Sequence, residues 1–392
     1  MKGYTATLAN GDTVEYVDRK RWLWLASVMY PLVPVIGILM HWQSGSEIWL
    51  FMPLVLYYGL TPLLDGLIGE DRNNPPEEVV GQLEKDRYYR RLTCATVPLH
   101  YVTLIACAAY AATQPLSVGG FVGLAAVAGL TAGLAINTGH ELGHQGTATE
   151  RLLAKIVLAV PAYGHFTIAH NNAHHRNVAT PEDPASARMG ESLYRFAWRE
   201  IPGAFREAWA IEKARLARFQ KPAWHRDNQI LQSYALTLLL SAALVIAFGL
   251  AVIPFLLIHN FLAYWQLTST NYIEHYGLLR GIEDNGRYER CQPHHSWNSN
   301  HVVSNLLLFH LERHSDHHAH PQRRYQALKH YDDLPTLPTG YFGTFLLAYV
   351  PPLWFRVMDK RLLALPNVEG DLGKVNIEPS ARTALLLNRG QD

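Results

Sequence analysis

The residues best suited to chemistry in this sequence are histidines, of which there are 20 among 392 residues. Nine of them form four clusters: His140 and His144; His170, His174 and His175; His275; and His314, His317 and His318. Histidines four positions apart share one face of a helix, so both imidazoles can reach one metal ion. Nine donors exceed what one tetrahedral or octahedral ion holds. We therefore predict two metal ions, with about four to five histidines each.

Carboxylates near the clusters are candidates for a supporting role. A metal-bound imidazole usually donates its other N–H to a carboxylate or carbonyl. Our candidates for these acceptors are Glu141, Asp183, Glu274 and Asp316. Among the remaining histidines, we expect His310 to lie nearest to the metals because it precedes His314 by four residues.

The first cluster also matches the HExxH helix of zinc proteases, in which Glu141 would be the general base. Intramembrane zinc proteases carry a Leu-Asp-Gly element as well, and LDG occurs here at 64–66. It precedes the HExxH in this chain, whereas it follows in those proteases. A protease would also leave seven of the nine histidines without a role, so this reading remains a remote alternative.

Long uncharged stretches indicate the elements that hold these clusters. Glu47 is the only charged residue between Arg21 and Asp65, and none occurs between Arg91 and Glu141 or between Asp227 and Glu274. Each stretch is long enough for two membrane spans of about 20 residues joined by a tight turn. The predicted spans are 21–42, 48–66, 92–112, 119–138, 229–248 and 251–270. We expect one membrane-embedded, all-α domain over 1–392, with six transmembrane helices in three hairpins.

The remaining charges predict the orientation in the membrane. Three hairpins place both termini and the segments 139–228 and 271–392 on one side, together with all Lys and Arg residues. Because Lys and Arg mark the cytoplasmic face, we expect a cytoplasmic helical cap that carries the histidines. The amphipathic segment 191–220 is expected to lie along the membrane surface or to pack on this cap. A water-soluble protein with buried helices is the weaker alternative, and a net charge of +1 indicates no nucleic-acid partner.

Taken together, the motifs resemble those of the membrane-bound non-haem di-iron alkane 1-monooxygenases, within the fatty-acid desaturase and hydroxylase superfamily. The resemblance runs from the first span to about Asp359. The matching motifs are HELGH at 140–144, ATPEDPA at 179–185, NYIEHYG at 271–277, RCQPHHSWNSN at 290–300 and LERHSDHHA at 311–319. The second histidine box departs from the family pattern, because Ala169 and Ala173 replace its usual Glu and Gly. All three histidines of that box remain, so we expect metal binding to survive.

The resemblance implies an enzyme of a bacterial inner membrane that converts medium- to long-chain n-alkanes into 1-alkanols. It implies two non-haem iron ions, O2 as co-substrate, and electrons from rubredoxin supplied by an NADH-dependent rubredoxin reductase. The sequence contains no flavin, haem or cysteine-cluster motif, so electrons must come from outside. Since rubredoxins are acidic, Arg323, Arg324 and Lys329 are a candidate docking patch.

Related membrane di-iron enzymes remain as alternatives, namely aryl-methyl hydroxylases such as xylene or cymene monooxygenase and fatty-acyl desaturases. The EHYG element at 274–277 favours an alkane hydroxylase. An alkane dissolved in lipid would enter sideways between spans, since each buried CH2 favours lipid by about 0.8 kcal/mol. The residues expected to line its path are Trp49, Phe51, Leu54, Tyr58, Gly133, Phe261 and Trp265.

Overall fold

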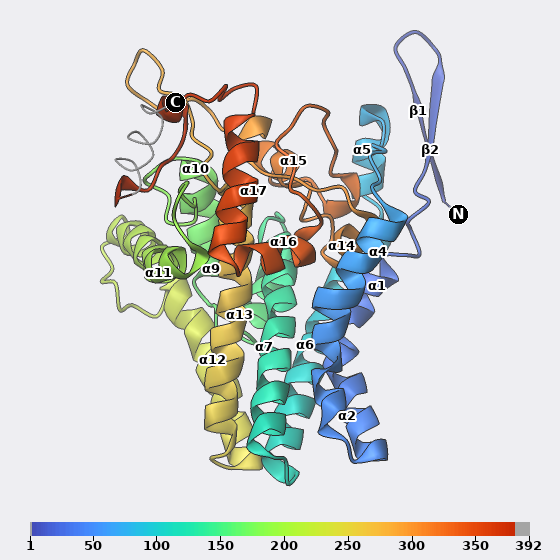
Figure 1. Cartoon of the computed structure of the whole chain (residues 1–392), viewed down its shortest axis with the longest axis vertical. Coiled ribbons are helices and arrows are strands. Elements are labelled where there is room, and N and C mark those ends of the chain that lie inside the picture. Colours follow the sequence, from blue (N-terminus) through green and yellow to red (C-terminus); the bar gives the residue numbers. More distant parts are fainter. Residues whose placement is uncertain (1, 381–392) are drawn as a thin grey trace.

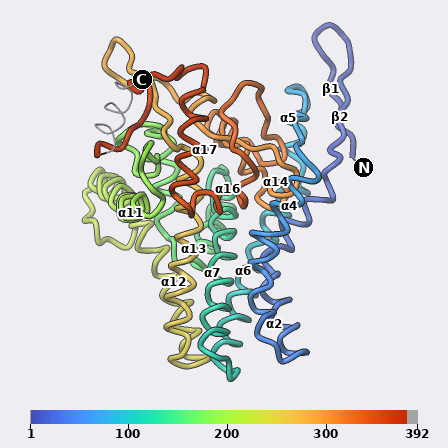
Figure 2. Tube along the Cα trace, in the orientation of Figure 1, coloured from blue at the N-terminus to red at the C-terminus, as the bar shows by residue number. Residues whose placement is uncertain are grey.

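A computed structural model of the chain describes residues 2–380. Long helices form a bundle at one end of the molecule, and shorter helices and loops cover its other end (Figure 1). The chain trace shows the segments coloured orange and red, which carry α14 to α17, lying above the bundle (Figure 2). An N-terminal β-hairpin projects beside them.

The described part of the chain contains one β-hairpin, and its other secondary-structure elements are helices. The antiparallel hairpin is β1 (Gly3–Thr7) and β2 (Thr13–Val17). The α-helices are α1 (Leu25–Met29), α2 (Val33–Ser44), α3 (Met52–Val55), α4 (Thr61–Ile68), α5 (Glu77–Glu84), α6 (Arg87–Thr113), α7 (Val118–Gly143), α8 (Ala148–Leu158), α9 (Phe166–Ala169), α10 (His175–Asn177), α11 (Leu193–Ala217), α12 (Gln229–Phe248), α13 (Val252–His275), α14 (Val302–Leu307), α15 (His314–Ala319), α16 (Tyr341–Ala348) and α17 (Pro351–Leu363). The short 3-10 helices are η1 (Tyr30–Leu32), η2 (Glu47–Phe51), η5 (Pro293–His295), η6 (Tyr325–Ala327) and η7 (Leu372–Lys374). The short π-helices are η3 (Leu56–Leu60) and η4 (His170–His174).

Within residues 2–380, five helical segments are long and apolar enough to cross a membrane: Leu25–Ser44, Glu47–Ile68, Arg87–Thr113, Val118–Gly143 and Gln229–Phe248. They coincide with the first five predicted spans. The sixth prediction, 251–270, corresponds to α13, which is long but does not reach the same hydropathy. Polar residues along α13, such as His259 and Gln266, explain the difference.

The turns between these helices lie at one end of the bundle, away from the histidine-bearing segments (Figure 1). Glu47, the single charge in its stretch, has a partner there: its Oε1 accepts a hydrogen bond from the Ser117 backbone N–H at 2.6 Å. Ser117 in turn caps α7, because its hydroxyl accepts from the Gly120 N–H at 3.0 Å. The tight turn before α7 therefore supplies hydrogen-bond partners both for the first N–H groups of the helix and for the isolated carboxylate.

Close packing of α7 against α13 positions the metal-binding ends of both helices. A Cβ on Gly129 would lie 2.4 Å from the His259 carbonyl oxygen, and one on Gly133 would lie 2.5 Å from Cγ of Gln266. Only glycine permits this approach of the two backbones. The two helices are thereby held side by side, with His140 near the end of α7 and His275 at the end of α13.

The amphipathic segment forms α11, which packs one face on the molecule. Its buried residues include Phe196, Ala208 and Leu216, whereas Trp198 on another face is 85% exposed. The helix packs against α13, α9, η4 and α12. The exposed aromatic face is available for contact with a membrane surface.

Candidate metal centre

The structure gathers the nine predicted histidines into two adjacent groups. The first holds five residues and the second holds four, and the potential ligand atoms within each group lie within 4.8 Å of one another. The first group comprises His140, His144, His170, His175 and His317, and the second comprises His174, His275, His314 and His318. The side chains come from the end of α7 and its C-cap residue His144, the η4–α10 segment, α13 and α15. Segments more than 170 positions apart in sequence therefore meet at one site.

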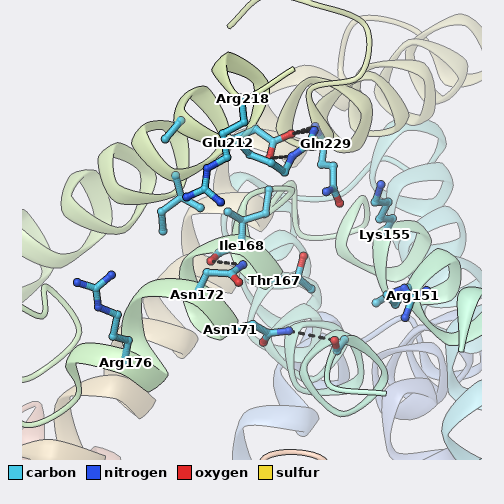
Figure 3. A pocket seen from close by; sticks show the side chains of 15 residues that line it. Arg151, Lys155, Thr167, Ile168, Asn171, Asn172, Arg176, Glu212, Arg218 and Gln229 are labelled. Carbon is cyan, nitrogen blue, oxygen red and sulfur yellow. Dashed lines mark hydrogen bonds and ion pairs between the residues drawn. The ribbon is translucent and has the colours of Figure 1, made fainter. Parts of the chain in front are cut away.

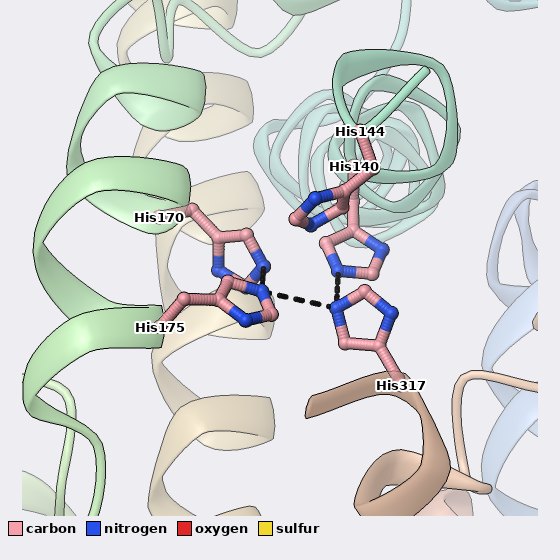
Figure 4. A group of neighbouring side chains, drawn as sticks. All are labelled: His140, His144, His170, His175 and His317. Carbon is pink, nitrogen blue, oxygen red and sulfur yellow. Dashed lines mark hydrogen bonds between the residues drawn. The ribbon is translucent and has the colours of Figure 1, made fainter. Parts of the chain in front are cut away.

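In the first group the Nε2 atoms converge on a common point (Figure 4). Those of His140 and His317 lie 2.9 Å apart, those of His170 and His175 lie 3.0 Å apart, and those of His175 and His317 lie 3.2 Å apart. The Nε2 atom of His144 is buried and has no hydrogen-bond partner within the described part of the chain. Converging nitrogens with an unpartnered buried atom are what a metal ion would satisfy.

The second group has the same character. The Nε2 atom of His314 lies 3.1 Å from that of His275 and 3.0 Å from that of His318. The ring of His174 stands 5.0 Å from both the His275 and His318 rings, measured between centroids. Its Nε2 atom is buried without a hydrogen-bond partner in residues 2–380.

A short π-helix divides the cluster of His170, His174 and His175 between the two groups. Residues 170–174 form η4, and His170 pairs with His175 in the first group while His174 joins the second. The sequence suggested an i, i+4 pair of His170 and His174 on one metal. The wider π-helix, which has i→i+5 hydrogen bonds, brings residues five positions apart together instead.

Burial keeps these imidazoles neutral. Removal from water, reinforced by the neighbouring histidines, lowers the pKa well below the ordinary value for His144, His170, His175, His314, His317 and His318. A neutral imidazole has the free electron pair that a metal requires. The donor set therefore fits two metal ions with nitrogen ligands.

Two of the four predicted carboxylates contact the histidines. Asp183 Oδ2 accepts a hydrogen bond from His174 Nδ1 at 2.9 Å and another from the Ser186 hydroxyl at 2.6 Å. Burial opposes its ionisation, but these partners hold the pKa of Asp183 below its ordinary value. Glu274 Oε1 lies 3.3 Å from His314 Nδ1. These contacts direct the Nε2 atoms of both histidines toward the metal site.

The other two carboxylates are engaged elsewhere. Asp316 accepts from both Arg323 and Tyr331, and Glu141 faces the Tyr325 backbone N–H at 3.5 Å. Each helical residue is turned about 100° from its neighbour, so a carboxylate beside a ligand in sequence points in another direction. His310 also lies outside both groups, where its Nδ1 donates to the Tyr325 carbonyl at 3.0 Å.

One supporting contact could not be found from side-chain spacing. His275 Nδ1 donates to the backbone carbonyl of His295 at 3.0 Å. His295 itself belongs to a further small group with Glu289 and His294. Any residue type can supply a carbonyl, so the sequence has no signal for this partner.

One cavity adjoins the metal centre, and a second cavity shares part of its lining. One is lined by His140, His170 and His314 together with Phe166 and Leu311. The other is lined by aromatic and aliphatic side chains, including Tyr30, Tyr57, Tyr58, Leu130, Leu134, Phe342 and Phe345. The residues common to both are Gly133, Asn137, Gln266, Thr270 and Leu311. The two cavities therefore lie next to each other between the helices, and the first of them reaches histidines of both groups.

Only part of the predicted path lies there. Tyr58 and Gly133 line the second cavity, but Trp49, Phe51, Leu54, Phe261 and Trp265 line neither. Phe51 packs instead against Gly123, and Phe261 is 61% exposed on the outside of the bundle. Trp265 contacts the rings of Tyr194 and Tyr349.

The three cations predicted to dock an electron donor have internal partners. Arg323 pairs with Asp316 at 2.9 Å, Arg324 pairs with Glu150 at 2.8 Å, and Lys329 pairs with Glu77. Their side chains are 9–14% exposed. These residues are therefore structural ion pairs and do not form a free cationic surface.

Comparison with known proteins agrees with this geometry. A fatty acid desaturase family model matches residues 115–356, a segment that contains all nine histidines. The chain is 55% identical to alkane 1-monooxygenase 1 of Alcanivorax borkumensis, over 95% of this chain and 92% of that protein. It is also 55% identical to an alkane 1-monooxygenase of Pseudomonas putida, over 98% and 95% of the two chains. The hydroxylase component of a Pseudomonas putida xylene/toluene monooxygenase is 26% identical over 86% of this chain and 82% of that protein.

Proposed function

Because the chain belongs to the alkane 1-monooxygenase family, within the fatty acid desaturase superfamily, we propose that it hydroxylates medium- to long-chain n-alkanes at a terminal methyl group. The observation that carries this proposal is that the nine gathered imidazoles adjoin a cavity lined by His140, His170 and His314, which shares a wall with a mostly apolar cavity. In the balanced reaction, one oxygen atom of O2 enters the C–H bond and the other leaves as water, with two electrons and two protons consumed.

The nine histidines would hold two iron ions, one in each group. When bound, the irons supply the redox chemistry that an unactivated C–H bond requires, since no base or nucleophile can attack it. Asp183 would orient His174, and Glu274 would orient His314. All three histidines of the second box lie in the two groups, although Ala169 and Ala173 replace the usual Glu and Gly of that box.

The cavity residues would position the alkane and exclude water. Polar groups in the shared wall are already engaged: Tyr58 donates to Gln266 Oε1 at 2.7 Å, and Asn137 donates to the Leu308 carbonyl at 2.8 Å. These two pairs leave fewer polar groups free to hold water against the apolar chain, and Tyr30 is a cavity residue whose buried hydroxyl has no hydrogen-bond partner within residues 2–380. Tyr58 and Gly133 would line the path, and Tyr30, Tyr57 and Phe342 would complete it.

We place the bundle in a bacterial inner membrane, with α13 as the sixth span in three hairpins. Its 24 residues would extend about 36 Å, which is enough to cross a hydrocarbon core of about 30 Å. The metal centre and both termini would then be cytoplasmic, because Lys and Arg gather on that side. Electrons would come from rubredoxin, itself reduced by an NADH-dependent reductase.

Hydroxylation assays test the substrate class. Membranes containing the protein, with rubredoxin, its reductase and NADH, are expected to form 1-alkanols from an n-alkane series. His317→Ala should abolish turnover and lower bound iron, whereas His320→Ala, on a half-exposed side chain just after α15, should retain both. Preferential oxidation of p-cymene, or formation of an alkene from an acyl substrate, would favour the related enzymes and contradict the proposal.

A further inference from the structure

A large hollow lies on the side of the metal centre, between α8, the η4–α10 segment, α11 and the start of α12 (Figure 3). Its volume is about 600 Å3, within the roughly 300–1,000 Å3 that small-molecule sites occupy. Its lining includes five cationic side chains and one carboxylate: Arg151, Lys155, Arg176, Arg215, Arg218 and Glu212. Neither the alkane path nor the histidine groups use these charges.

Four of the five cations lack an acidic partner. Glu212 holds Arg215 through two hydrogen bonds of 2.8 and 2.6 Å, so this pair is neutral. No carboxylate of residues 2–380 lies within ion-pair distance of the other four: Arg151, Lys155, Arg176 and Arg218. Lys155 donates to Gln232 at 3.1 Å, and Arg151 donates to the Gly146 carbonyl at 2.5 Å. The hollow therefore concentrates uncompensated positive charge and favours an anion.

The position of α12 sets the level of the hollow relative to the proposed membrane. Gln229 lines the hollow and is also the first residue of α12, whose 20 residues extend about 30 Å. This length matches the hydrocarbon core, and only 17% of the apolar window of α12 is buried in the protein. Under the topology proposed above, on which this inference rests, the hollow lies at the level of the lipid headgroups.

Exposed apolar side chains follow the cations along the chain. Leu152 comes directly after Arg151, and Phe219 comes directly after Arg218. Leu152, Phe219 and Trp224 are 56%, 63% and 77% exposed. Aromatic side chains beside cations are typical of a membrane interface, where rings sit among headgroups. An acidic protein docking from water would instead need a surface clear of the headgroup layer.

We propose that this hollow binds the phosphate of an anionic phospholipid, with the acyl chains lying against α12. Basic pockets on the cytoplasmic side of membrane helices recognise anionic headgroups through such charges. The site also adjoins the first histidine group: Asn171, between His170 and His175, lines the hollow and donates to the Gly143 carbonyl at 3.0 Å. A bound headgroup would brace the segment that carries these two ligands.

Lipid binding can be measured without turnover, so its failure is separable from failure of the hydroxylase proposal. The purified full-length protein would be titrated with dioctanoyl phosphatidylglycerol, dioctanoyl phosphatidylcholine and inorganic phosphate, with binding followed by native mass spectrometry. We expect one saturable phosphatidylglycerol site and much weaker phosphatidylcholine binding. Each cation lost should weaken binding about fivefold, so Arg151→Gln with Arg218→Gln should weaken it about 25-fold.

The matched control is Lys213→Gln, which removes a charge from α11 outside the hollow and should leave binding unchanged. If the double variant does not fold, Arg218→Gln alone tests the same contact, because Arg218 is exposed. Equal binding by variant and parent would overturn the proposal. Binding of inorganic phosphate alone would overturn the lipid assignment. Unchanged lipid binding with a raised apparent KM for rubredoxin would make the hollow a protein-docking site and also overturn it.

Discussion

Asp183 offers a direct test of how the second histidine group is held. Its carboxylate is 1% exposed, accepts from His174 Nδ1 at 2.9 Å, and accepts through Oδ1 from the Ala185 N–H at 3.1 Å. In Asp183→Asn, one of these two donors must face the new NH2 group, and the negative charge beside His174 is lost. Loss of such a supporting carboxylate typically weakens metal binding roughly 10- to 100-fold, or about 1.4–2.7 kcal/mol.

The assay is the iron content of purified protein equilibrated against a graded series of chelator concentrations. Asp183→Asn should release about half of the iron at roughly 10- to 100-fold lower chelator activity than the parent, and the other half as the parent does. The control is Glu207→Gln, because Glu207 and Asp183 line one small cavity beside His170 and His174, and Glu207 has no hydrogen bond to a histidine within residues 2–380. Identical release curves for Asp183→Asn and the parent would refute the assigned role.

Three further predictions follow from the packing and the charges. Gly129→Ala would place a Cβ 2.4 Å from the His259 carbonyl oxygen, so α7 and α13 must separate; overpacking of about 1–3 kcal/mol should lower the thermal midpoint, and an unchanged midpoint would contradict the packing. Lys329→Gln should leave the apparent KM for rubredoxin unchanged, because Lys329 pairs with Glu77; a severalfold rise would restore it as a docking residue. Burial raises the pKa of Asp359 to about 6, so its contribution to stability is fully present below the unfolded pKa of 3.8 and is lost as pH rises through 6. The stability of Asp359→Asn relative to the parent should therefore increase as the pH rises from 4 to 8. Parallel melting-temperature profiles for the two proteins would refute this.

Much of the metal centre could be predicted from the sequence because ligand type and helical spacing are local properties. Eight of the nine histidines of the two groups were identified from their spacing, and His275 was included as a single histidine that follows the last predicted span. The division of these histidines into two groups was not predictable, since it depends on the π-helix at 170–174. Asp183 was found as a carboxylate, but its bond to His174 depends on the fold of the intervening loop.

Other contacts could not be predicted from the sequence because the residues that form them are distant along the chain. Arg324 looks free in sequence, yet it meets Glu150 from α8. Phe342 of α16 joins Tyr57 of η3 around the second cavity, and no periodicity links these positions. Uncharged stretches predicted five apolar spans well, whereas the polar residues that α13 places against α7 reduce its signal.

Metal analysis of group-specific variants tests the central claim most directly. The purified parent should contain two irons per chain, while His144→Ala and His174→Ala, in different groups, should each retain about one. The retained irons should differ in their Mössbauer parameters, because one site keeps four histidines from the second group and the other keeps five from the first. A single zinc in the parent, or loss of the same iron in both variants, would contradict a centre built from two histidine groups.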